Sequence, residues 1–520
     1  MKRINCFIST RAAILLVSSI ITIATSPVVC PARTSACSHE NISSISNPIL
    51  PGFNPDPSIC RVGDDYYLVT SSFMFFPGLP VYHSRDLAHW KLIGHAINSD
   101  NIKDFHFKGL TDNDGIWAPT LRYHNGTFYI ICTLYHGGGS FILQTSDPSQ
   151  GWGHPVWIPQ ASGIDPTLFW DSDGRTYYLG NRYDFKHAWS GQVGIWLQEI
   201  DLDHIEQRTV TEKKSGLSFE APCYTLKGSP KILSYGHATN ARYAEGPHLY
   251  KIKDRYCLLM AEGGSGKYHA VTVHWSDSLF GNYKPQQINP VLTHRHLGRH
   301  FRVQNVGHAD LVQLQSGEWM AVCLANRMLP VKDDSNTPWV SPLGRETWLC
   351  RVGIEDGQLV FAPGAGQLQE SLPSPLPVDN VDLETDTTWY TPMTNTNLRL
   401  KKLTSLKWSF QHRVGKNTGA QGITVFRTVN SYYMLEKGKK HIQLIKIERG
   451  KKTIIAALPY RKSNADLSVQ CDSLSLRFFA NGAPIGSEQS MLPLCDDGKY
   501  NKFNGTGVGY VIEYKNKRRK

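Results

Sequence analysis

The feature that most constrains how this chain can fold is a short unit that recurs five times between residues 63 and 321. Each copy is a polar turn, rich in Gly, Asp or Asn, that leads directly into an aromatic or β-branched run. The copies lie at residues 63–69, 125–130, 173–179, 253–258 and 316–321. Helical periodicity is scarce, so the repeats predict successive hairpins of an all-β protein.

Five hairpins spaced in this way are typical of radial repetition, as in a β-propeller. The alternative is a pair of β-sandwiches, but the units are spaced like blades rather than like the hairpins of one sandwich. In a propeller the first strand of every blade surrounds one central channel, so side chains far apart in the sequence converge there. We therefore predict a five-bladed propeller over residues 45–362.

The pattern changes after a Pro-rich stretch at residues 363–384, which is typical of a linker. Beyond it, runs such as 422–426, 441–447 and 474–479 alternate apolar and polar residues. This alternation is typical of an antiparallel sheet with one face in water. We predict a concanavalin-like β-sandwich over residues 385–520, ending in a basic tail.

The positive charge of the chain is confined to its last part. The formal net charge is +11, of which residues 401–520 carry +15 and residues 1–400 carry −4. A basic region raises nucleic acid as a partner, but no zinc finger or other nucleic-acid motif accompanies it. We expect no nucleic-acid partner and interpret the run at residues 515–520 as a solvated chain end. At most, the charge helps the second domain adhere to acidic wall polysaccharides.

Residues 1–36 are interpreted as a secretory signal and leader. Lys2, Arg3 and Arg11 precede an apolar run that starts at Ala12, and small residues follow it. The run is shorter than the ~20 apolar residues that a membrane span needs and fits a signal peptide. We expect an extracellular protein, or a periplasmic one in a Gram-negative source, with no membrane span after cleavage. An uncleaved signal anchor is the alternative.

The 11 cysteines are scattered and include no Cys-x-x-Cys pair, which argues against a zinc site. An oxidising compartment would permit one or two disulfides. The candidate pairs are Cys30 with Cys37 and Cys471 with Cys495.

Three acidic residues lie in unusual local contexts. Asp56 is flanked by two prolines, Asp165 directly precedes one, and Glu245 precedes one after a single Gly. Proline fixes the backbone and removes a donor, so each carboxylate would be aimed by an extended chain. Each motif precedes a strand of a different predicted blade. A propeller would therefore gather all three at one end of its channel, although each alone is more often a turn or loop residue.

Paired carboxylates are what the hydrolysis of a glycosidic bond requires. An inverting enzyme holds its acid and its base ~6.5–9.5 Å apart, so that water fits between them. A third carboxylate near the acid can raise the pKa of that acid by repulsion. Three such acids together favour a glycosidase.

Aromatic and basic residues near these acids fit a sugar pocket. Phe73 lies in a run of three phenylalanines, Trp117 lies in Gly-Ile-Trp-Ala-Pro, and Arg345 can clamp hydroxyls or an acid. His308 can bind sugar, orient a carboxylate or ligate a metal. The alternatives are core packing for the aromatic residues, a structural pairing of Arg345 with Glu346, and a satisfied core histidine.

These motifs together resemble glycoside hydrolase family 43, in the β-xylosidase and α-L-arabinofuranosidase branch with a C-terminal sandwich. The specific segments are residues 47–59, 245–251 and 342–347, and the resemblance runs from about 47 to 370 and, more weakly, to about 510. It implies a five-bladed propeller and hydrolysis with inversion of configuration.

The resemblance also implies roles for individual residues. Asp56 would be the general base, Glu245 the general acid, and Asp165 the residue that tunes the pKa of the acid and holds it in position. The pocket for the terminal sugar would be lined by Phe73, Trp117, Ser265, His308 and Arg345. No cofactor is required, but some members hold calcium near the histidine that matches His308, so calcium is left open.

The chain departs from the pattern of the family at several places, including Met74, where the family often has an acidic residue. Residues 201–241 are longer and more basic than expected before the motif of the acid. The segment around Phe503 resembles a family strand that brings a phenylalanine over the active site, but the chain then runs into its basic end. We therefore expect no last strand and doubt that Phe503 forms a lid.

The resulting hypothesis is a secreted, inverting exo-glycosidase. It would remove terminal β-1,4-xylosyl or α-L-arabinofuranosyl residues from xylo-oligosaccharide or arabinoxylan substrates, and the sequence does not rank the two sugars. The alternative is a non-catalytic carbohydrate-binding propeller protein. A homo-oligomer is left open.

Overall fold

The computed structural model describes residues 43–331, 336–378, 386–416, 418–496 and 498–512. Across these ranges the chain forms 35 β-strands and three short 3₁₀ helices, with no α-helix. No helix in these ranges is long and apolar enough to cross a membrane.

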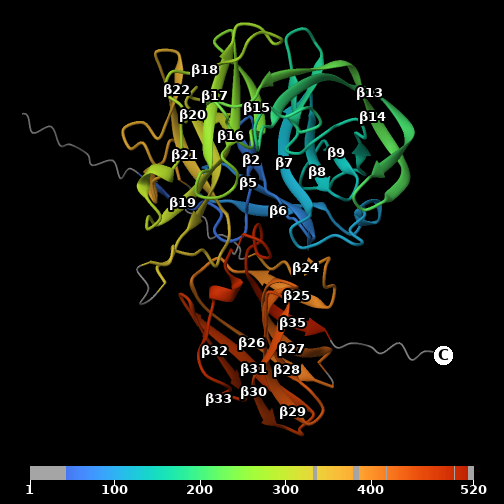
Figure 1. The fold of residues 1–520 in the computed structure, drawn as a ribbon, viewed down its shortest axis with the longest axis vertical. Helices are drawn as coiled ribbons and strands as arrows, with labels where there is room; N and C mark the ends of the chain where they lie inside the picture. Colours follow the sequence, from blue (N-terminus) through green and yellow to red (C-terminus); the bar gives the residue numbers. More distant parts are fainter. Residues whose placement is uncertain (1–42, 332–335, 379–385, 417, 497, 513–520) are drawn as a thin grey trace, which may run out of the picture. The chain divides into compact units, whose positions relative to one another are not determined.

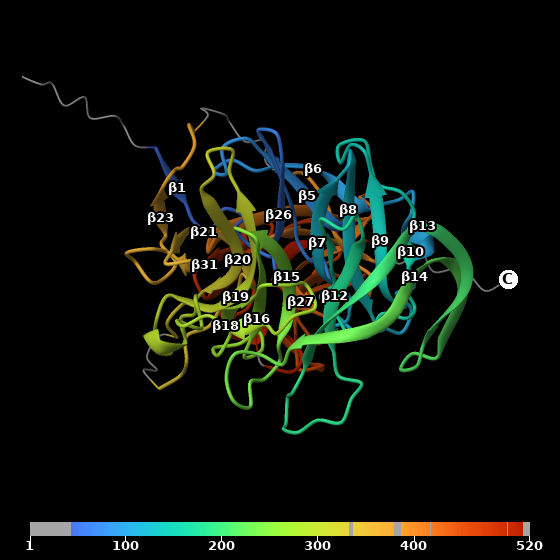
Figure 2. The same ribbon diagram turned by 90° about the horizontal axis from the view of Figure 1, so that it is seen from above.

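Five blades of four antiparallel strands each form the propeller, and we number them I to V (Figures 1 and 2). Blade I contains β2 (Ser58–Val62), β3 (Asp65–Val69), β5 (Gly78–Ser84) and β6 (Lys91–Ile97). Blade II contains β7 (Gly115–His124), β8 (Thr127–Tyr135), β9 (Gly139–Thr145) and β10 (Val156–Trp157). Blade III contains β11 (Thr167–Trp170), β12 (Thr176–Arg182), β13 (Gly194–Glu212) and β14 (Leu217–Ser234).

The remaining blades follow the same order. Blade IV contains β15 (Glu245–Ile252), β16 (Arg255–Glu262), β17 (Ala270–Ser276) and β18 (Lys284–Pro285). Blade V contains β19 (Val303–Gln313), β20 (Trp319–Arg327), β21 (Glu346–Glu355) and β22 (Gln358–Phe361). The predicted fold class is thereby confirmed. The five repeats of the sequence each mark the turn between the first and second strands of a blade, where a polar turn must lead into a buried strand.

The long segment before the motif of Glu245 is a curved hairpin. β13 and β14 have 19 and 18 residues, far longer than the other blade strands. β14 also pairs in parallel with β10 through Trp157 and Cys223, so blades II and III form one eight-stranded sheet. The indole of Trp157 packs edge-on against Phe219 at 5.3 Å. The extra residues therefore cover the outer edge of blade II.

Buried ionic contacts join the innermost strands of four blades. Asp310 of β19 is fully buried and accepts both Arg122 Nη1 (2.8 Å) and Arg122 Nη2 (3.0 Å) from β7. It also accepts Ser58 Oγ at 2.5 Å and the backbone N–H of Ile59 at 3.1 Å, both from β2. Tyr250 Oη of β15 donates to it at 2.5 Å. With five donors around one carboxylate, the cost of burying its charge is offset by hydrogen bonds and by an opposite charge.

A second all-β region is formed by two antiparallel sheets. One has the order β25-β35-β27-β28-β29-β30 and the other contains β26-β31-β32-β33. Their strands are β25 (Leu398–Lys402), β26 (Lys407–Gly415), β27 (Ala420–Thr428), β28 (Ser431–Lys437), β29 (His441–Glu448), β30 (Lys451–Pro459), β31 (Asn464–Asp472), β32 (Ser475–Ala480), β33 (Ala483–Pro484) and β35 (Gly507–Ile512). Both sheets contribute to one apolar cluster that includes Val425, Leu435, Leu467 and Phe478. This is the predicted sandwich.

Two expectations about this region are wrong. A last strand does exist, because β35 pairs with β25 on one side and with β27 on the other. Cys471 and Cys495 form no disulfide; both thiols are free and buried. The thiol of Cys495 donates instead to the carbonyl oxygen of Met491, at 3.5 Å. Cys30 and Cys37 lie outside the described residues.

Candidate active site

A cavity of about 420 Å³ lies where the innermost strands of the propeller begin. All eight residues predicted from the sequence to form the site line it, together with residues that were not predicted. The eight are Asp56, Phe73, Trp117, Asp165, Glu245, Ser265, His308 and Arg345. Their convergence from all five blades follows from the radial topology.

Backbone conformation aims the acids at this cavity. Asp56 and Asp165 both adopt positive φ, at 53° and 54°, directly before their prolines. Non-glycine residues rarely adopt this region, and such strain clusters at functional sites. Glu245 is the first residue of β15, and Gly246 behind it has φ 55°. The proline motifs thus turn the chain sharply just before it enters the strand.

Asp56 is held by donors on both carboxylate oxygens. Arg345 Nη1 donates to Oδ1 at 2.6 Å, and Ser71 Oγ donates to Oδ2 at 2.7 Å. Ser71 Oγ in turn accepts the backbone N–H of Ala118 at 2.7 Å. This chain of contacts fixes the carboxylate in one orientation and leaves acceptor capacity for a further donor, because each carboxylate oxygen accepts more than one hydrogen bond.

Glu245 and Asp165 lie in an environment that favours their protonated forms. Burial, followed by the negative charge of Asp56, raises the pKa of Glu245 to about 7, against the opposing positive charges of Arg345 and Lys502. Burial, then the charges of Glu245 and Asp56, hold the pKa of Asp165 well above its usual range. The backbone N–H of Gly246 donates to Asp165 Oδ2 at 3.1 Å, which ties this acid to the backbone next to Glu245.

The pairing of Arg345 with Glu346 that was weighed as an alternative does not occur. Glu346 is fully buried and accepts two hydrogen bonds of 2.7 Å from Arg327 instead. Neighbours along a strand point to opposite faces of the sheet. Arg345, on the other face, is therefore available to Asp56.

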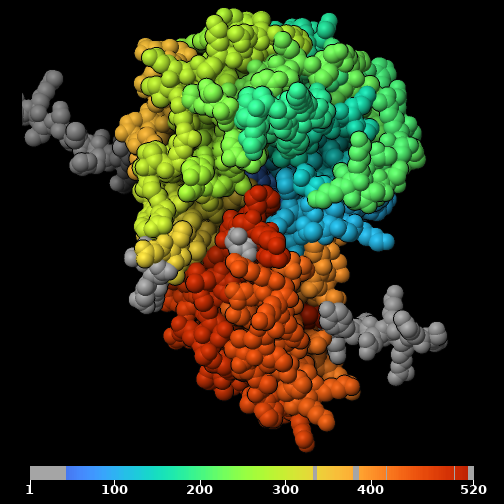
Figure 3. Space-filling model, viewed as in Figure 1, coloured from blue at the N-terminus to red at the C-terminus, as the bar shows by residue number. Residues whose placement is uncertain are grey.

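The second region contributes to the cavity through Lys502 and Phe503. The ring of Phe503 stacks on Phe73 at 5.7 Å and lies edge-on to Trp117 at 5.3 Å. A Cβ on Gly505 would lie 2.6 Å from the carbonyl oxygen of Leu343, so only glycine allows this close approach. The doubt about Phe503 was therefore misplaced; Figure 3 shows the red C-terminal segment against the propeller.

Sequence reasoning missed several residues of the site. Ser71 orients Asp56 without lining the cavity; it lies two positions before Phe73 in the same motif, and this proximity was the available signal. The missed lining residues include Tyr135, Tyr183, Tyr243, His269 and Lys502. They lie in loops or at strand ends without a distinctive local pattern, so only the fold brings them to the cavity.

Few protein oxygen atoms near His308 are free to bind a calcium ion. Calcium prefers six to eight oxygen ligands, but the carboxylate two residues along β19 is Asp310, whose oxygens are occupied by Arg122, Ser58 and Tyr250. Asp56, whose charge also acts on His308, is paired with Arg345. Across the described part of the chain, no group of three or more His, Cys, Asp or Glu residues could hold a metal.

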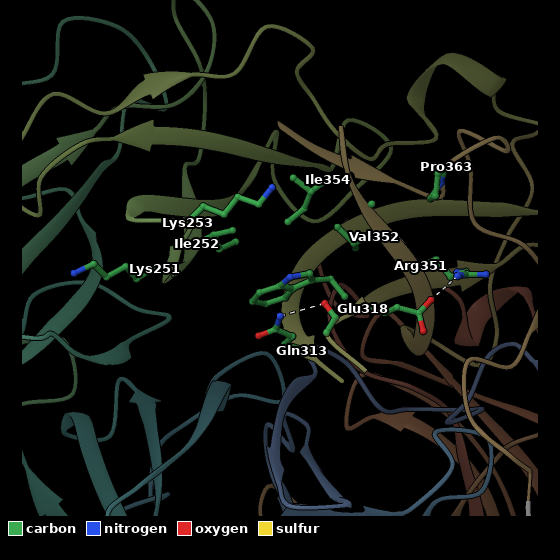
Figure 4. A pocket seen from close by; sticks show the side chains of 12 residues that line it. Lys251, Ile252, Lys253, Gln313, Glu318, Arg351, Val352, Ile354 and Pro363 are labelled. Atoms are coloured by element: carbon green, nitrogen blue, oxygen red, sulfur yellow. Dashed lines mark hydrogen bonds and ion pairs between the residues drawn. The ribbon is translucent and has the colours of Figure 1, made fainter. Parts of the chain in front are cut away.

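A larger cavity of about 540 Å³ lies at the other ends of the strands of blades IV and V (Figure 4). Its lining includes Lys251, Lys253, Trp319 and Arg351. Its one acid, Glu318, is paired with Arg351 at 2.8 Å. Without a second carboxylate, this cavity offers no acid and base pair.

Comparisons with known proteins agree with this geometry. The family model for glycosyl hydrolases family 43 matches residues 45–359. A xylosidase/arabinosidase from Butyrivibrio fibrisolvens is 42% identical over 335 residues, which cover 64% of this chain and 59% of that protein. A non-reducing end alpha-L-arabinofuranosidase from Bacteroides ovatus is 42% identical over 309 residues, covering 59% of this chain and 51% of that protein. The matches thus span less than two thirds of these relatives.

Solved structures resemble the chain over most of its length. The crystal structure of a xylan beta-1,4-xylosidase from Bacillus halodurans has a TM-score of 0.77 and 28% identity, and the likeness covers 90% of this chain and 96% of that one. A family 43 structure retrieved from a capybara gut metagenome has a TM-score of 0.76 and 28% identity, covering 90% and 95%. Together with the match across the propeller, they establish that this chain belongs to glycosyl hydrolase family 43.

Proposed function

We propose that this protein is an exo-glycosidase that removes terminal xylosyl or arabinofuranosyl residues from xylan-derived oligosaccharides with inversion of configuration. The observation that carries the proposal is that Asp56, Asp165 and Glu245, from three different blades, line one cavity. The printed activities of the relatives, xylosidase/arabinosidase and alpha-L-arabinofuranosidase, support the sugar class.

In this mechanism Asp56 is the general base. Arg345 and Ser71 orient its carboxylate, which accepts a proton from the water that attacks the anomeric carbon. Water and the leaving group lie on opposite faces of the sugar, so a single displacement inverts the configuration. Phe73, Trp117 and Phe503 supply aromatic faces against which the C–H face of the sugar packs.

Glu245 is the general acid and gives its proton to the leaving oxygen. The raised pKa of about 7 keeps a large share of this residue protonated near neutral pH, as the role requires. Asp165 is a positioning residue: through the backbone N–H of Gly246 it holds the start of β15. The negative charge of Asp56 also raises the pKa of Glu245.

The test compares two substrates that differ in how much they need an acid. Nitrophenolate leaves without protonation, whereas the sugar oxygen of xylobiose does not. Asp56→Asn should lower kcat/KM on both substrates by ~10²–10⁴-fold. Glu245→Gln should lower kcat/KM on xylobiose by nearly as much. It should lower kcat/KM on nitrophenyl β-xyloside much less.

Rates on nitrophenyl α-L-arabinofuranoside rank the two sugars, and NMR of the first-formed anomer reports inversion. Full activity of Glu245→Gln on xylobiose would refute the assignment. Binding of xylo-oligosaccharides without turnover would favour the non-catalytic alternative. Secretion is part of the proposal as well, and the N-terminal sequence of the protein recovered from its native host tests it.

A further inference from the structure

We propose that an aromatic platform outside the cavity, formed by Phe185, Trp189 and Tyr235, binds the part of the substrate chain that is not cleaved. The inference rests on the proposed function and extends it: the preferred substrate would be an oligosaccharide of several pentosyl units rather than a disaccharide. None of the three residues lines the cavity.

The platform lies at the end of blade III that carries the catalytic acids. β12 ends at Arg182, which pairs with Gly194 at the start of β13, and Ile195 pairs with Ser234 at the end of β14. Phe185 and Trp189 belong to the loop between β12 and β13, seen in Figure 2 reaching out from the blade. Tyr235 directly follows β14.

The three rings form one cluster with an accessible surface. Tyr235 meets Phe185 edge-on at 5.7 Å and Trp189 edge-on at 6.4 Å. Tyr235 is 41% exposed, and Phe185 and Trp189 are half-buried. Grouped aromatic side chains left open to water mark binding sites more often than isolated ones do, and aromatic faces suit the C–H faces of sugars.

The cluster is held rigidly against the segment that leads to Glu245. Trp189 Nε1 donates to the carbonyl oxygen of Ala241 at 2.7 Å, and the backbone N–H of Tyr243 donates to the carbonyl oxygen of Gly191 at 2.8 Å. Within the loop, the backbone N–H of Ala188 donates to Gln192 Oε1 at 2.6 Å. A preorganised surface binds with little loss of conformational entropy.

The position of the platform next to the cavity indicates that it binds the rest of the substrate chain. Tyr183, in the same loop as Phe185, and Tyr243, bonded to that loop, both line the cavity and are 41% and 43% exposed. Tyr183 and Tyr243 therefore connect the loop of the platform to the lining of the cavity. When a terminal sugar occupies the cavity, the rest of its chain must leave through the mouth, and this path offers it stacking surfaces.

The experiment measures kcat/KM on xylobiose, xylotetraose, xylohexaose and nitrophenyl β-xyloside for the full chain and for Phe185→Ala/Tyr235→Ala. Trp189 is left intact because it also anchors residue 241. The matched control is Phe280→Ala, which removes a 52% exposed ring beyond β17, at the end of blade IV away from Glu245.

We expect kcat/KM of the unmodified protein to rise with chain length. The double variant should lose about tenfold on xylotetraose and xylohexaose, lose little on nitrophenyl β-xyloside, and show no rise with length. Phe280→Ala should follow the unmodified protein. Equal profiles for the double variant and the unmodified protein would overturn the platform, as would a uniform loss on all substrates, which indicates a disturbed Glu245.

Failure of the proposed function looks different. If the unmodified protein hydrolyses none of these substrates, that function is wrong, and calorimetric binding of xylohexaose then decides the platform: weaker binding by the double variant supports it, and equal binding refutes it. If sedimentation shows that the unmodified protein dimerises and the double variant does not, the three rings form a dimer interface and the inference fails.

Discussion

Two arginine–aspartate pairs lie in the channel of the propeller, and they have different surroundings. Asp310 accepts five hydrogen bonds, from Arg122, Ser58, Tyr250 and the backbone of Ile59. Asp56, two residues before Ser58, accepts one from Arg345 and one from Ser71. Both carboxylates are almost completely buried, with 0% and 5% of their surface exposed.

Both acids are buried, so burial does not distinguish them. A carboxylate whose acceptor sites are all occupied is structural, whereas one with a free acceptor site can take part in the reaction. The neighbouring Arg122 holds the pKa of Asp310 below its usual range despite burial, and no acceptor site of that carboxylate is left for a water. Asp56 retains such capacity and faces a cavity. The first pair joins blades; the second orients a base.

The largest expected effect concerns the first pair. Arg122→Met leaves Asp310 buried without its cation and should lower the free energy of unfolding by ~3–5 kcal/mol, measured by urea denaturation. Arg122→Met/Asp310→Leu should recover much of that loss, because it also removes the orphaned charge. If the double variant is no more stable than the single variant, the ionic interpretation of this cluster is wrong.

The second pair should respond in activity rather than in stability. Arg345→Lys keeps a positive charge but loses the guanidinium geometry that orients Asp56, so kcat/KM on xylobiose should fall about 10²-fold. The unfolding free energy should change by less than about 1 kcal/mol. If this variant lost as much stability as Arg122→Met while keeping its activity, the assignment of Arg345 to catalysis rather than to stability would be wrong.

The pH profile tests the role of Glu245 as the general acid. Glu245 must be protonated to act, and its pKa is about 7. Below that pH, kcat/KM on xylobiose should no longer change with the titration of Glu245; above it, kcat/KM should fall tenfold per pH unit, and this limb should be absent in Glu245→Gln. An unmodified protein at full activity two units above neutrality would contradict the role of Glu245.

The smallest expected effect tests how the charge of Lys502 acts on the pKa of Glu245. The positive charge of Lys502 opposes the raised pKa of Glu245. Lys502→Met should therefore move the alkaline limb of the profile to higher pH, with little change in the activity plateau. Lys502→Arg keeps the charge and serves as the control. A shift in the opposite direction, or an equal shift in both variants, would show that the charge of Lys502 does not act on Glu245.

The fold predicted from the sequence is confirmed, and the eight residues predicted for the site line one cavity, largely because turns and acid motifs leave local signals. A polar turn before a strand marked each blade, and a proline beside each acid marked Asp56, Asp165 and Glu245. Sequence reasoning failed where the signal is not local. Tyr183 and Tyr243 lie in ordinary loops, and the Cys471–Cys495 pairing was a guess from position that the structure refutes.

The sequence by itself therefore determined the local elements: a chain of β repeats in which the proline-linked acids belong to different blades. Only the tertiary structure decided which residues meet. Arg345 reaches Asp56 across 289 positions of sequence, and Phe503 closes on Phe73 from the second region. Turns and strand motifs are encoded by neighbouring residues. A pKa or an ion pair, however, depends on burial and on charges that only the folded chain brings together.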